Sequence, residues 1–262
     1  MLIPILDTPE IWLRTAIRTA AAQSYPNIDV ILSDNGSRAS TIEVLKQAKE
    51  RWPDRIILTQ ENEKKGTAYA LDAALRAADK DTAWFSKLDS DDIAFSGLEK
   101  CPCKGSGMHR HPGREEARVE LFGKLPESVA LVYDNYMQLV YEPRPHLIPI
   151  ILRPYDYRAL LEGNYIHGNS IWRSSVFERW GGPLKETFVY DGYEGKANRH
   201  GEDYNLWLNI TDFADGFWMN VDPAFTWTYR SYQGSKYMSD RKGVDYCRAF
   251  LQNRARERRG LL

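Results

Sequence analysis

Three aspartates stand close together in the first half of the chain. Asp89, Asp91 and Asp92 lie within four residues and directly follow the strand-like run 84–88. Neighbouring carboxylates repel one another, and one of them keeps its proton unless a cation offsets the charge. Because Mg²⁺ and Mn²⁺ prefer carboxylate and phosphate oxygens as ligands, the cluster predicts a divalent metal site. The alternative is a solvated turn after a strand, since Asp and Ser are common turn residues.

A second polar cluster follows an earlier strand-like run. Asp34, Asn35 and Gly36 come after the apolar run 28–32. In open sheets of parallel strands, ligands bind at the carboxyl ends of the strands. Both polar clusters stand at such ends, and this placement favours a binding function for both. A plain turn at Asn35-Gly36 is the alternative.

The first third of the chain alternates strand-like and helix-like segments. Short apolar runs predict strands over 2–6, 28–32, 56–58 and 83–88. Helical spacing of apolar residues predicts helices between them. We expect Thr8 to cap the first helix, a capping box from Ser40 to Glu43 to open the second, and Gly66 to precede the third. Repeated strand–helix units predict an α/β fold with a mostly parallel sheet and helices on both faces.

The pattern changes after residue 95. Gly, Pro, Lys, Arg and His dominate 96–126, which is interpreted as an insertion or long loop without clear periodicity before Ala117. Beyond it, strands are expected over 131–133, 139–141 and 217–221. Helices are expected over 155–161, 174–180 and 202–213, with another in the tail from Val244.

Size, charge and cysteine content limit the class of protein. The chain has 262 residues and a formal net charge of −1, which gives no reason to expect a nucleic-acid partner. Three cysteines, two of them too close together for an ordinary structural disulfide, favour a reducing compartment and a cytoplasmic protein. The start of the chain lacks the features of a signal peptide. No run approaches the roughly 18 apolar residues of a membrane helix, so any membrane association is expected to be peripheral, for instance through the arginines of 248–259.

Several short motifs, taken together, resemble those of the family 2 glycosyltransferases. They occur in the family's order and cover most of the chain outside 96–126. Each motif alone is weak, but their joint order and spacing is specific. The motifs are Gln23–Ser37, Asn62 with Gly66–Leu75, Leu88–Asp92, Gly201-Glu202-Asp203 with Leu206-Trp207, and Tyr229-Arg230.

This resemblance implies a GT-A fold, in which a Rossmann-type, mostly parallel sheet is flanked by helices and the C-terminal half binds the acceptor. It implies a metal-dependent, inverting glycosyltransferase that moves a sugar from a nucleotide-diphosphate sugar to a hydroxyl of a glycan or glycoconjugate. UDP is the expected nucleotide. A single catalytic domain over 1–262 is then expected, with a nucleotide-sugar-binding half (1–95), the insertion or loop (96–126), and an acceptor-binding half that ends in the C-terminal helix (127–262).

The family's functional residues map onto this sequence position by position. The resemblance implies that Asp203, beside Glu202 in one catalytic motif, is the general base that takes the acceptor's proton. It implies that Asp91, with Asp89, ligates Mg²⁺ or Mn²⁺ on the donor pyrophosphate. The implied donor-binding positions are Pro4, Leu6, Asp34, Asn35, Gly36, Asp89, Ser90 and Arg230.

The chain departs from the family pattern at a few positions. Asn35 stands where the family usually has Asp, and Asp72 stands where it usually has Asn. The first strand matches the family's Pro-Thr-Tyr-Asn turn only at Pro4. Of these departures, Asn35 bears on the implied contact with the nucleotide.

Other interpretations of the same residues stay open. An acid such as Asp203 at a helix N-terminus is favoured by the helix dipole alone. A nucleotidyltransferase on a similar sheet is expected to carry a Gly-rich, basic phosphate loop near the first strand, and none stands beside 2–6. A non-catalytic nucleotide-sugar-binding module of the same fold would keep both polar clusters without turnover.

One pattern lies outside the resemblance. Cys101, Cys103, His109 and His111 offer two thiols and two imidazoles, a set that suits a structural, tetrahedral Zn²⁺. Their one-residue gaps are tighter than the usual ligand spacing. The alternative is a loop over the donor site.

Overall fold

The structure is a computed structural model that describes residues 1–97, 113–178, 201–211, 216–220, 227–232 and 241–260. The four residues expected to bind zinc lie outside this part, so the structure does not test that prediction. The last residues of the helix expected over 174–180 also lie outside it; its described part is α6 (Ser175–Glu178).

The first half of the chain forms the expected parallel sheet. The strands run in the order β3-β2-β1, and Leu2 of β1 bridges Lys87 in parallel register beyond the end of β4. The elements are β1 (Leu2–Ile5), α1 (Glu10–Ala21), β2 (Val30–Asn35), α2 (Ala39–Arg51), β3 (Ile56–Glu61), α3 (Thr67–Ala77) and β4 (Trp84–Ser86).

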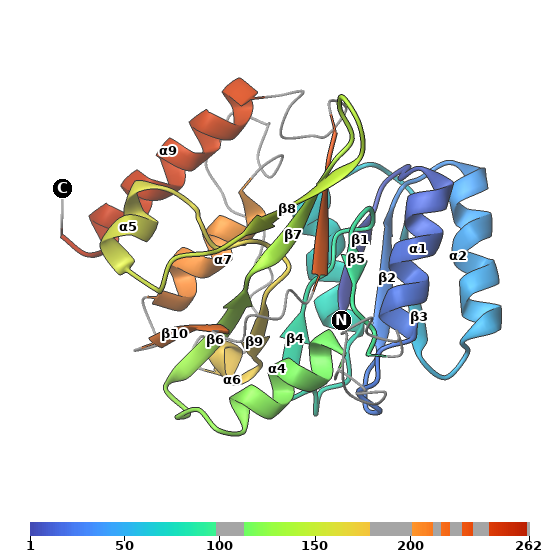
Figure 1. Cartoon of the computed structure of the whole chain (residues 1–262), viewed down its shortest axis with the longest axis horizontal. Helices are drawn as coiled ribbons and strands as arrows, with labels where there is room; N and C mark the ends of the chain where they lie inside the picture. Colours follow the sequence, from blue (N-terminus) through green and yellow to red (C-terminus); the bar gives the residue numbers. More distant parts are fainter. Residues whose placement is uncertain (98–112, 179–200, 212–215, 221–226, 233–240, 261–262) are drawn as a thin grey trace.

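Alternate residues of the first strands face opposite layers. Leu2 and Ile31 belong to the core that includes α3, whereas Ile3 and Leu32 belong to the core under α1 and α2. Successive strand side chains point to opposite faces, so a strand that is apolar at every position is covered on both sides. Figure 1 shows α1 and α2 as the outer layer on one side of these strands. The predicted α/β fold with helices on both faces is confirmed.

The second half adds two further sheets. One has the order β4-β9-β6-β10 and lies beside β1 through the Leu2–Lys87 bridge, and the other has the order β5-β11-β7-β8. The strands are β5 (Ile93–Ala94), β6 (Val129–Asp134), β7 (Tyr136–Val140), β8 (His146–Ile150), β9 (Ile171–Arg173), β10 (Gly216–Asn220) and β11 (Trp227–Ser231). The helices, besides α6, are α4 (Arg114–Phe122), α5 (Tyr157–Glu162), α7 (Glu202–Thr211) and α9 (Arg241–Arg258).

Two predicted helix caps are wrong. The Thr8 hydroxyl does not cap α1; it lies 2.6 Å from the Ser90 hydroxyl instead, and Pro9 takes the cap position. No capping box opens α2, because that helix starts at Ala39 after Arg38 and has no side-chain cap. In both cases a tertiary contact or an earlier helix start replaces the local motif.

Strand β2 is longer than its apolar run. It continues through Asp34 and Asn35, which pair in parallel with Gln60 and Glu61 of β3. These two polar residues therefore end a strand rather than begin a loop. Pairing with β3 keeps these two residues in strand conformation, although their polar side chains alone do not indicate a strand.

A helix lies inside the segment interpreted as an insertion or long loop. Helix α4 starts at Arg114, before the periodicity visible from Ala117, and its inner face carries Arg114, Glu115 and Arg118. All three side chains are buried. A charged inner face hides such a helix from an analysis based on apolar spacing.

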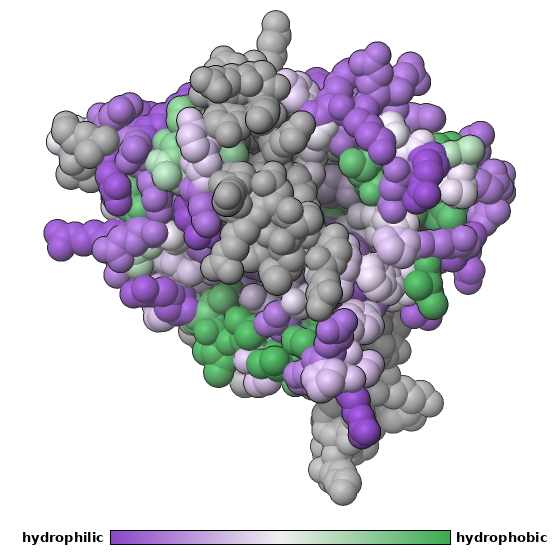
Figure 2. Space-filling model, turned by 90° about the horizontal axis from the view of Figure 1, so that it is seen from above, coloured by the Kyte–Doolittle hydropathy of each residue, from purple (hydrophilic) through white to green (hydrophobic). Residues whose placement is uncertain are grey.

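The described surface is mixed in character. Figure 2 shows a largely hydrophilic face with small hydrophobic areas between the polar ones. Among the helices in the described residues, none is long and apolar enough to cross a membrane.

Candidate active site

The loops after β1, β2 and β4 meet at one edge of the sheet. The Asp7 backbone N–H donates to the Ser37 hydroxyl at 3.1 Å, which ties the first loop to the second. The contact between Thr8 and Ser90 ties the first loop to the third. Both polar clusters expected at strand ends thus lie at the same edge, as the parallel arrangement requires.

Asp92 is the anchored member of the acidic cluster. It is fully buried, and its carboxylate accepts the Asn169 side-chain N–H at 2.7 Å and the Arg230 backbone N–H at 3.0 Å. Burial and the charges of Asp89 and Asp91 raise the pKa of Asp92 well above its ordinary value. Asp92 therefore joins the acidic loop to the segments around 169 and 230.

Asp91 is only partly compensated by its neighbours. Burial, and then the charge of Asp89, raise the pKa of Asp91 to about 6. The Tyr232 hydroxyl donates to its Oδ2 at 3.2 Å and partly opposes this shift. A nearby cation would stabilise the ionised form of this buried carboxyl group.

Lys87 is a functional candidate that the sequence analysis missed. Its side chain is 2 % exposed, and its Nζ lies 3.0 Å from Asp89 Oδ1 and 3.0 Å from both carboxylate oxygens of Asp203. Burial alone would lower the pKa of Lys87, but the carboxylates of Asp203 and Asp89 outweigh it and raise that pKa. A lysine at the end of a buried strand, two residues before Asp89, is the signal that could have revealed it.

Asp203 reaches the acidic loop from the first turn of α7. Its side chain is 19 % exposed. Burial raises the pKa of Asp203 to about 7. The charge of Lys87 opposes this rise, but burial together with the charges of Glu202 and Asp89 outweighs it. The predicted base Asp203 and Asp89, one of the two predicted metal ligands, are far apart in sequence but both contact Lys87.

Gly168 leaves the room that this arrangement needs. A Cβ at Gly168 would lie 2.1 Å from Asp203 Oδ2 and 2.8 Å from Lys87 Nζ. Any side chain there would displace the carboxylate and the ammonium together. The neighbouring Asn169 helps to hold the backbone of the acidic loop, because its Oδ1 accepts the Asp89 backbone N–H at 3.0 Å.

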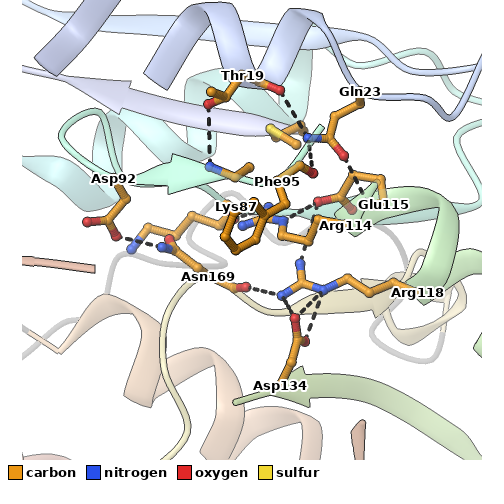
Figure 3. A network of polar contacts seen from close by, with 12 residues as sticks. Thr19, Gln23, Lys87, Asp92, Phe95, Arg114, Glu115, Arg118, Asp134 and Asn169 are labelled. Carbon is orange, nitrogen blue, oxygen red and sulfur yellow. Dashed lines mark hydrogen bonds and ion pairs between the residues drawn. The ribbon is translucent and has the colours of Figure 1, made fainter. Parts of the chain in front are cut away.

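Helix α4 supports the site from behind through buried charges (Figure 3). Arg114 Nη2 donates to the Lys87 carbonyl at 2.9 Å, and Arg118 Nη2 donates to the Asn169 carbonyl at 2.7 Å. Arg118 also pairs with Asp134 at 2.7 Å. Charge-assisted bonds in a buried setting fix the backbone on both sides of the acidic loop.

The predicted nucleotide residues Asp34 and Asn35 are buried and bonded to nearby backbone. The Asp34 carboxylate accepts the Gly36 and Ser37 N–H groups, each at 3.2 Å. Asn35 Oδ1 accepts the Lys65 and Gly66 N–H groups at 2.9 and 3.1 Å. The amide oxygen of Asn35 thus holds the start of α3 as a carboxylate would, which explains how Asn is accommodated here.

Gly36 is required by the backbone. Its φ is +78°, and a Cβ there would lie 2.7 Å from the Glu63 carbonyl carbon. Pro4 is buried in β1 opposite Ser33, and Leu6 is 41 % exposed just after that strand. Of the two predicted donor-binding residues in this region, Pro4 is therefore buried and Leu6 is accessible.

Arg230 lies beside the acidic loop. Its Nη1 donates to the Tyr141 hydroxyl at 2.6 Å, and its guanidinium stands 5.6 Å from the Trp12 ring centre. Its side-chain Nε is buried without a hydrogen-bond partner among the described residues. A buried, unpaired donor beside carboxylates suits an anionic ligand.

His167 is part of an aromatic group rather than a proton carrier. Burial lowers the pKa of His167 to about 3, and its Nδ1 accepts the Asn169 backbone N–H at 3.2 Å. Its ring centre lies 4.3 Å from that of Trp227 and 5.1 Å from that of Tyr136. Tyr136 is half-buried, so this group presents an aromatic surface next to the acidic loop.

The acidic loop fits a divalent cation only in part. Within the described residues, no group of three or more His, Cys, Asp or Glu side chains is arranged to hold a metal. Asp89 and Asp91 supply carboxylate oxygens, and Mg²⁺ typically takes one or two carboxylates together with substrate phosphates and waters. The donor set therefore suits a cation that arrives with a diphosphate.

Sequence comparison gives the family pattern. The model for the family described as "Glycosyl transferase family 2" matches residues 2–100. The "Putative glycosyltransferase EpsE" of Bacillus subtilis is 27% identical over 207 residues, covering 78% of this chain and 63% of EpsE. The Escherichia coli "UDP-Glc:alpha-D-GlcNAc-diphosphoundecaprenol beta-1,3-glucosyltransferase WfaP" is 32% identical over 92 residues, covering 32% of this chain and 36% of that protein. The chain thus spans less than two thirds of either relative's length.

Structural comparison gives the same fold. Staphylococcus aureus TarS 1–349 in complex with UDP-GlcNAc matches with a TM-score of 0.63 at 12% identity, over 91% of this chain and 59% of that one. The mannosyltransferase PcManGT from Pyrobaculum calidifontis, in complex with GDP-Man and Mn²⁺, matches with a TM-score of 0.56 at 17% identity, over 90% of this chain and 57% of that one. The expected resemblance and the GT-A fold are both confirmed.

Proposed function

We propose that this chain, which carries the family 2 glycosyltransferase pattern in residues 2–100 on a GT-A fold, is an inverting glycosyltransferase. It would move a sugar from a nucleotide-diphosphate sugar to a hydroxyl of a glycan or glycoconjugate. The observation that carries this proposal is the meeting of Asp203 with Asp89 at the ammonium group of Lys87. This contact brings the proposed base close to one proposed pyrophosphate-side acid, which supports a single site for both.

Asp203 is proposed as the general base, with Glu202 beside it. As the acceptor oxygen forms its bond to the anomeric carbon, the acceptor hydroxyl proton passes to the Asp203 carboxylate. The bond between the anomeric carbon and the diphosphate oxygen breaks, and its electron pair leaves with the nucleoside diphosphate. Attack from the face opposite the leaving group inverts the anomeric configuration. A pKa of Asp203 raised to about 7 suits proton transfer near neutral pH.

Asp91 and Asp89 are proposed to hold Mg²⁺ or Mn²⁺ against the donor diphosphate. Such a cation neutralises the charge that develops on the leaving group. The raised pKa of Asp91, caused by burial and by the charge of Asp89, supports this role because a cation would relieve both. Arg230, whose Nε has no partner among the described residues, is proposed to face the same diphosphate.

The donor nucleotide is proposed to lie along the ends of β1 and β2. Pro4, Leu6, Asp34, Asn35, Gly36 and Ser90 are the residues proposed to bind it there. UDP is the proposed nucleotide, supported by the UDP-GlcNAc complex of TarS and by the UDP-Glc in the name of WfaP. The acceptor would lie on the other side, where the rings around His167 offer a surface for a sugar.

We also propose one catalytic domain over 1–262, with the nucleotide half in 1–95 and the acceptor half in 127–262. One hydrophobic core contains Leu2 and Ile31 together with Leu206 and Leu251, which supports a single cooperative unit. The free, buried Cys247 supports a reducing, cytoplasmic location. A structural zinc at Cys101, Cys103, His109 and His111 stays a proposal about residues that the structure does not describe.

Release of nucleoside diphosphate from a panel of UDP- and GDP-sugars, with Mn²⁺ and with chelator, tests the activity. Asp203→Asn should lower the transfer rate about 10²–10⁴-fold, and Asp91→Asn should remove most of the metal-dependent rate. Asp54→Asn, at an exposed position, is the matched control and should behave as wild type. Equal rates for Asp203→Asn and Asp54→Asn would exclude Asp203 as the base. Donor binding by the wild type without any release would favour the non-catalytic module instead.

A further inference from the structure

Lys87 has no assigned part in the proposed reaction, yet it is a buried cation whose ammonium contacts the acidic loop. Its Nζ contacts three carboxylate oxygens at 3.0 Å, two from Asp203 and one from Asp89. A lysine ammonium has three N–H donors, so these contacts use all of them. Burying a charge is costly unless it is paired, and here the pairing spans two segments that are 114 residues apart.

The position of Lys87 is fixed by its backbone as well as by its side chain. Its N–H donates to the Ser170 carbonyl at 3.2 Å, and its own carbonyl accepts Arg114 Nη2 at 2.9 Å. The backbone of Gly168 comes close to the ammonium, since a Cβ there would lie 2.8 Å from Nζ. The backbone of Lys87 is therefore held on both sides, and its ammonium is confined beside Gly168.

Lys87 also has the wrong charge for a metal-binding loop. A cation on Asp89 occupies an oxygen that a divalent ion would use, and its charge repels that ion. An uncharged residue at this strand end would avoid that repulsion. The same ammonium holds both carboxylate oxygens of Asp203, and this contact offers a benefit that offsets the repulsion.

We propose that Lys87 is a positioning residue that holds the Asp203 carboxylate in its place for the acceptor proton, at the expense of metal affinity at Asp89. This inference rests on the proposed function for the identity of the reaction. It predicts effects of opposite sign on two measurements. Loss of the Lys87 charge should slow transfer and tighten the binding of a divalent cation. Loss of a residue with a purely structural role would slow transfer and also weaken cation binding.

Lys87→Met, which keeps the length of the side chain and removes its charge, is the central variant. Mn²⁺ affinity is measured without donor, by the electron paramagnetic resonance signal of free Mn²⁺. It should be at least about threefold tighter than in wild type, because a unit positive charge a few ångström from the ion is gone. Transfer kcat should fall about 100-fold with donor KM changed by less than about threefold, since an interaction of the transition state is lost. Lys80→Met, at an exposed position, is the control and should change neither quantity.

A second pair of variants separates positioning from folding. Lys87→Met leaves Asp89 and Asp203 without their shared cation and can unfold the chain for that reason. Lys87→Met/Asp203→Asn removes one of these charges with the lysine and should fold better. If Lys87 acts through Asp203, the lysine substitution should cost no further rate in the Asp203→Asn background. Lys87→Arg, which restores the charge, should recover part of the kcat lost in Lys87→Met.

Several outcomes would overturn the proposal. Weaker Mn²⁺ binding in folded Lys87→Met, or rate losses that multiply in the double variant, would show that Lys87 is structural only. A wild-type protein that transfers no sugar from any donor would defeat the proposed function but not the charge argument. In that case tighter Mn²⁺ binding by Lys87→Met still supports the competition at Asp89, and unchanged binding contradicts it.

Discussion

At the scale of single residues, the site depends on small distances around the Lys87 ammonium. Gly168 shows this most clearly, because it borders both Asp203 and Lys87 with no room for a methyl group. Its backbone is not in the left-handed region, so its role is one of space and not of conformational freedom. A substitution there tests the geometry without removing any charge.

Gly168→Ala should displace the Asp203 carboxylate, because the added Cβ would stand 2.1 Å from its Oδ2. We expect transfer to slow about 100-fold through misplacement of the base, with about 1–3 kcal/mol lost from the free energy of unfolding. Gly163→Ala is the matched control, since nothing lies within 4 Å of its added Cβ and its φ is −178°. Steady-state kinetics and urea unfolding measure the two effects. Equal behaviour of the two variants would contradict the contact.

Burial raises the pKa of Asp203 from 3.8 to about 7, and this shift predicts how both activity and stability depend on pH. As a base, Asp203 must be ionised, so kcat/KM should rise with pH through about 7. The folded state binds this proton more tightly than the unfolded state, so the stabilisation is complete below about pH 4 and is lost as pH rises to about 7. In the metal-free protein, Asp203→Asn should therefore narrow the stability difference between pH 5 and pH 8. An unchanged difference, measured by urea unfolding, would contradict the raised pKa.

At the scale of elements, helix α4 joins the site to the core through charges rather than through apolar packing. Arg118 is fully buried, contacts Asp134 through two nitrogens and also holds the Asn169 carbonyl. Breaking a buried ion pair by removing one partner is far more costly than losing a surface pair. The helix is thus a structural support for the loops that carry Asp89 and Asn169.

Arg118→Met should reduce the free energy of unfolding by about 3–5 kcal/mol, because Asp134 is left charged and buried. Lys124→Met removes a pair with Glu120 in which both side chains are more than half exposed, and it should cost no more than about 1 kcal/mol. Arg118→Met/Asp134→Leu should recover part of the loss. Urea unfolding of the three variants checks this. A small loss for Arg118→Met alone would mean that the buried pair does not hold α4.

The elements also show what sequence patterns reveal. Strands β1 and β2 were predictable because their side chains are apolar on both faces. The acidic loop was predictable as a candidate site because neighbouring carboxylates repel one another unless a cation offsets their charge. The start of α4 was not, since Arg114 and Arg118 point inward. The partners of Asp203 were not either, because Lys87 reaches it only through tertiary structure. Local periodicity carries no information about such contacts.

At the scale of the whole molecule, the two halves share one core. Leu2 and Ile31 from the nucleotide half belong to the same cluster as Leu206 of α7 and Leu251 of α9. Asp203 lies in the first turn of α7, the helix that carries Leu206, so packing of this helix in the core that it shares with β1 and β2 helps to fix the proposed base. This predicts that the chain unfolds in one transition and that donor binding at one edge stabilises all of it.

Thermal unfolding with a panel of nucleotide sugars tests this coupling. A donor at about 100 times its dissociation constant should add about 2.7 kcal/mol to the free energy of unfolding. We expect this gain with Mn²⁺ and little of it with chelator, because Asp89 and Asp91 need a cation to accept a diphosphate beside them. UMP, which has one phosphate, is the control and should depend much less on metal. Equal stabilisation by a UDP-sugar with and without Mn²⁺ would remove the metal from the proposed site. Two separate transitions, with only one of them shifted by donor, would show that the halves fold independently.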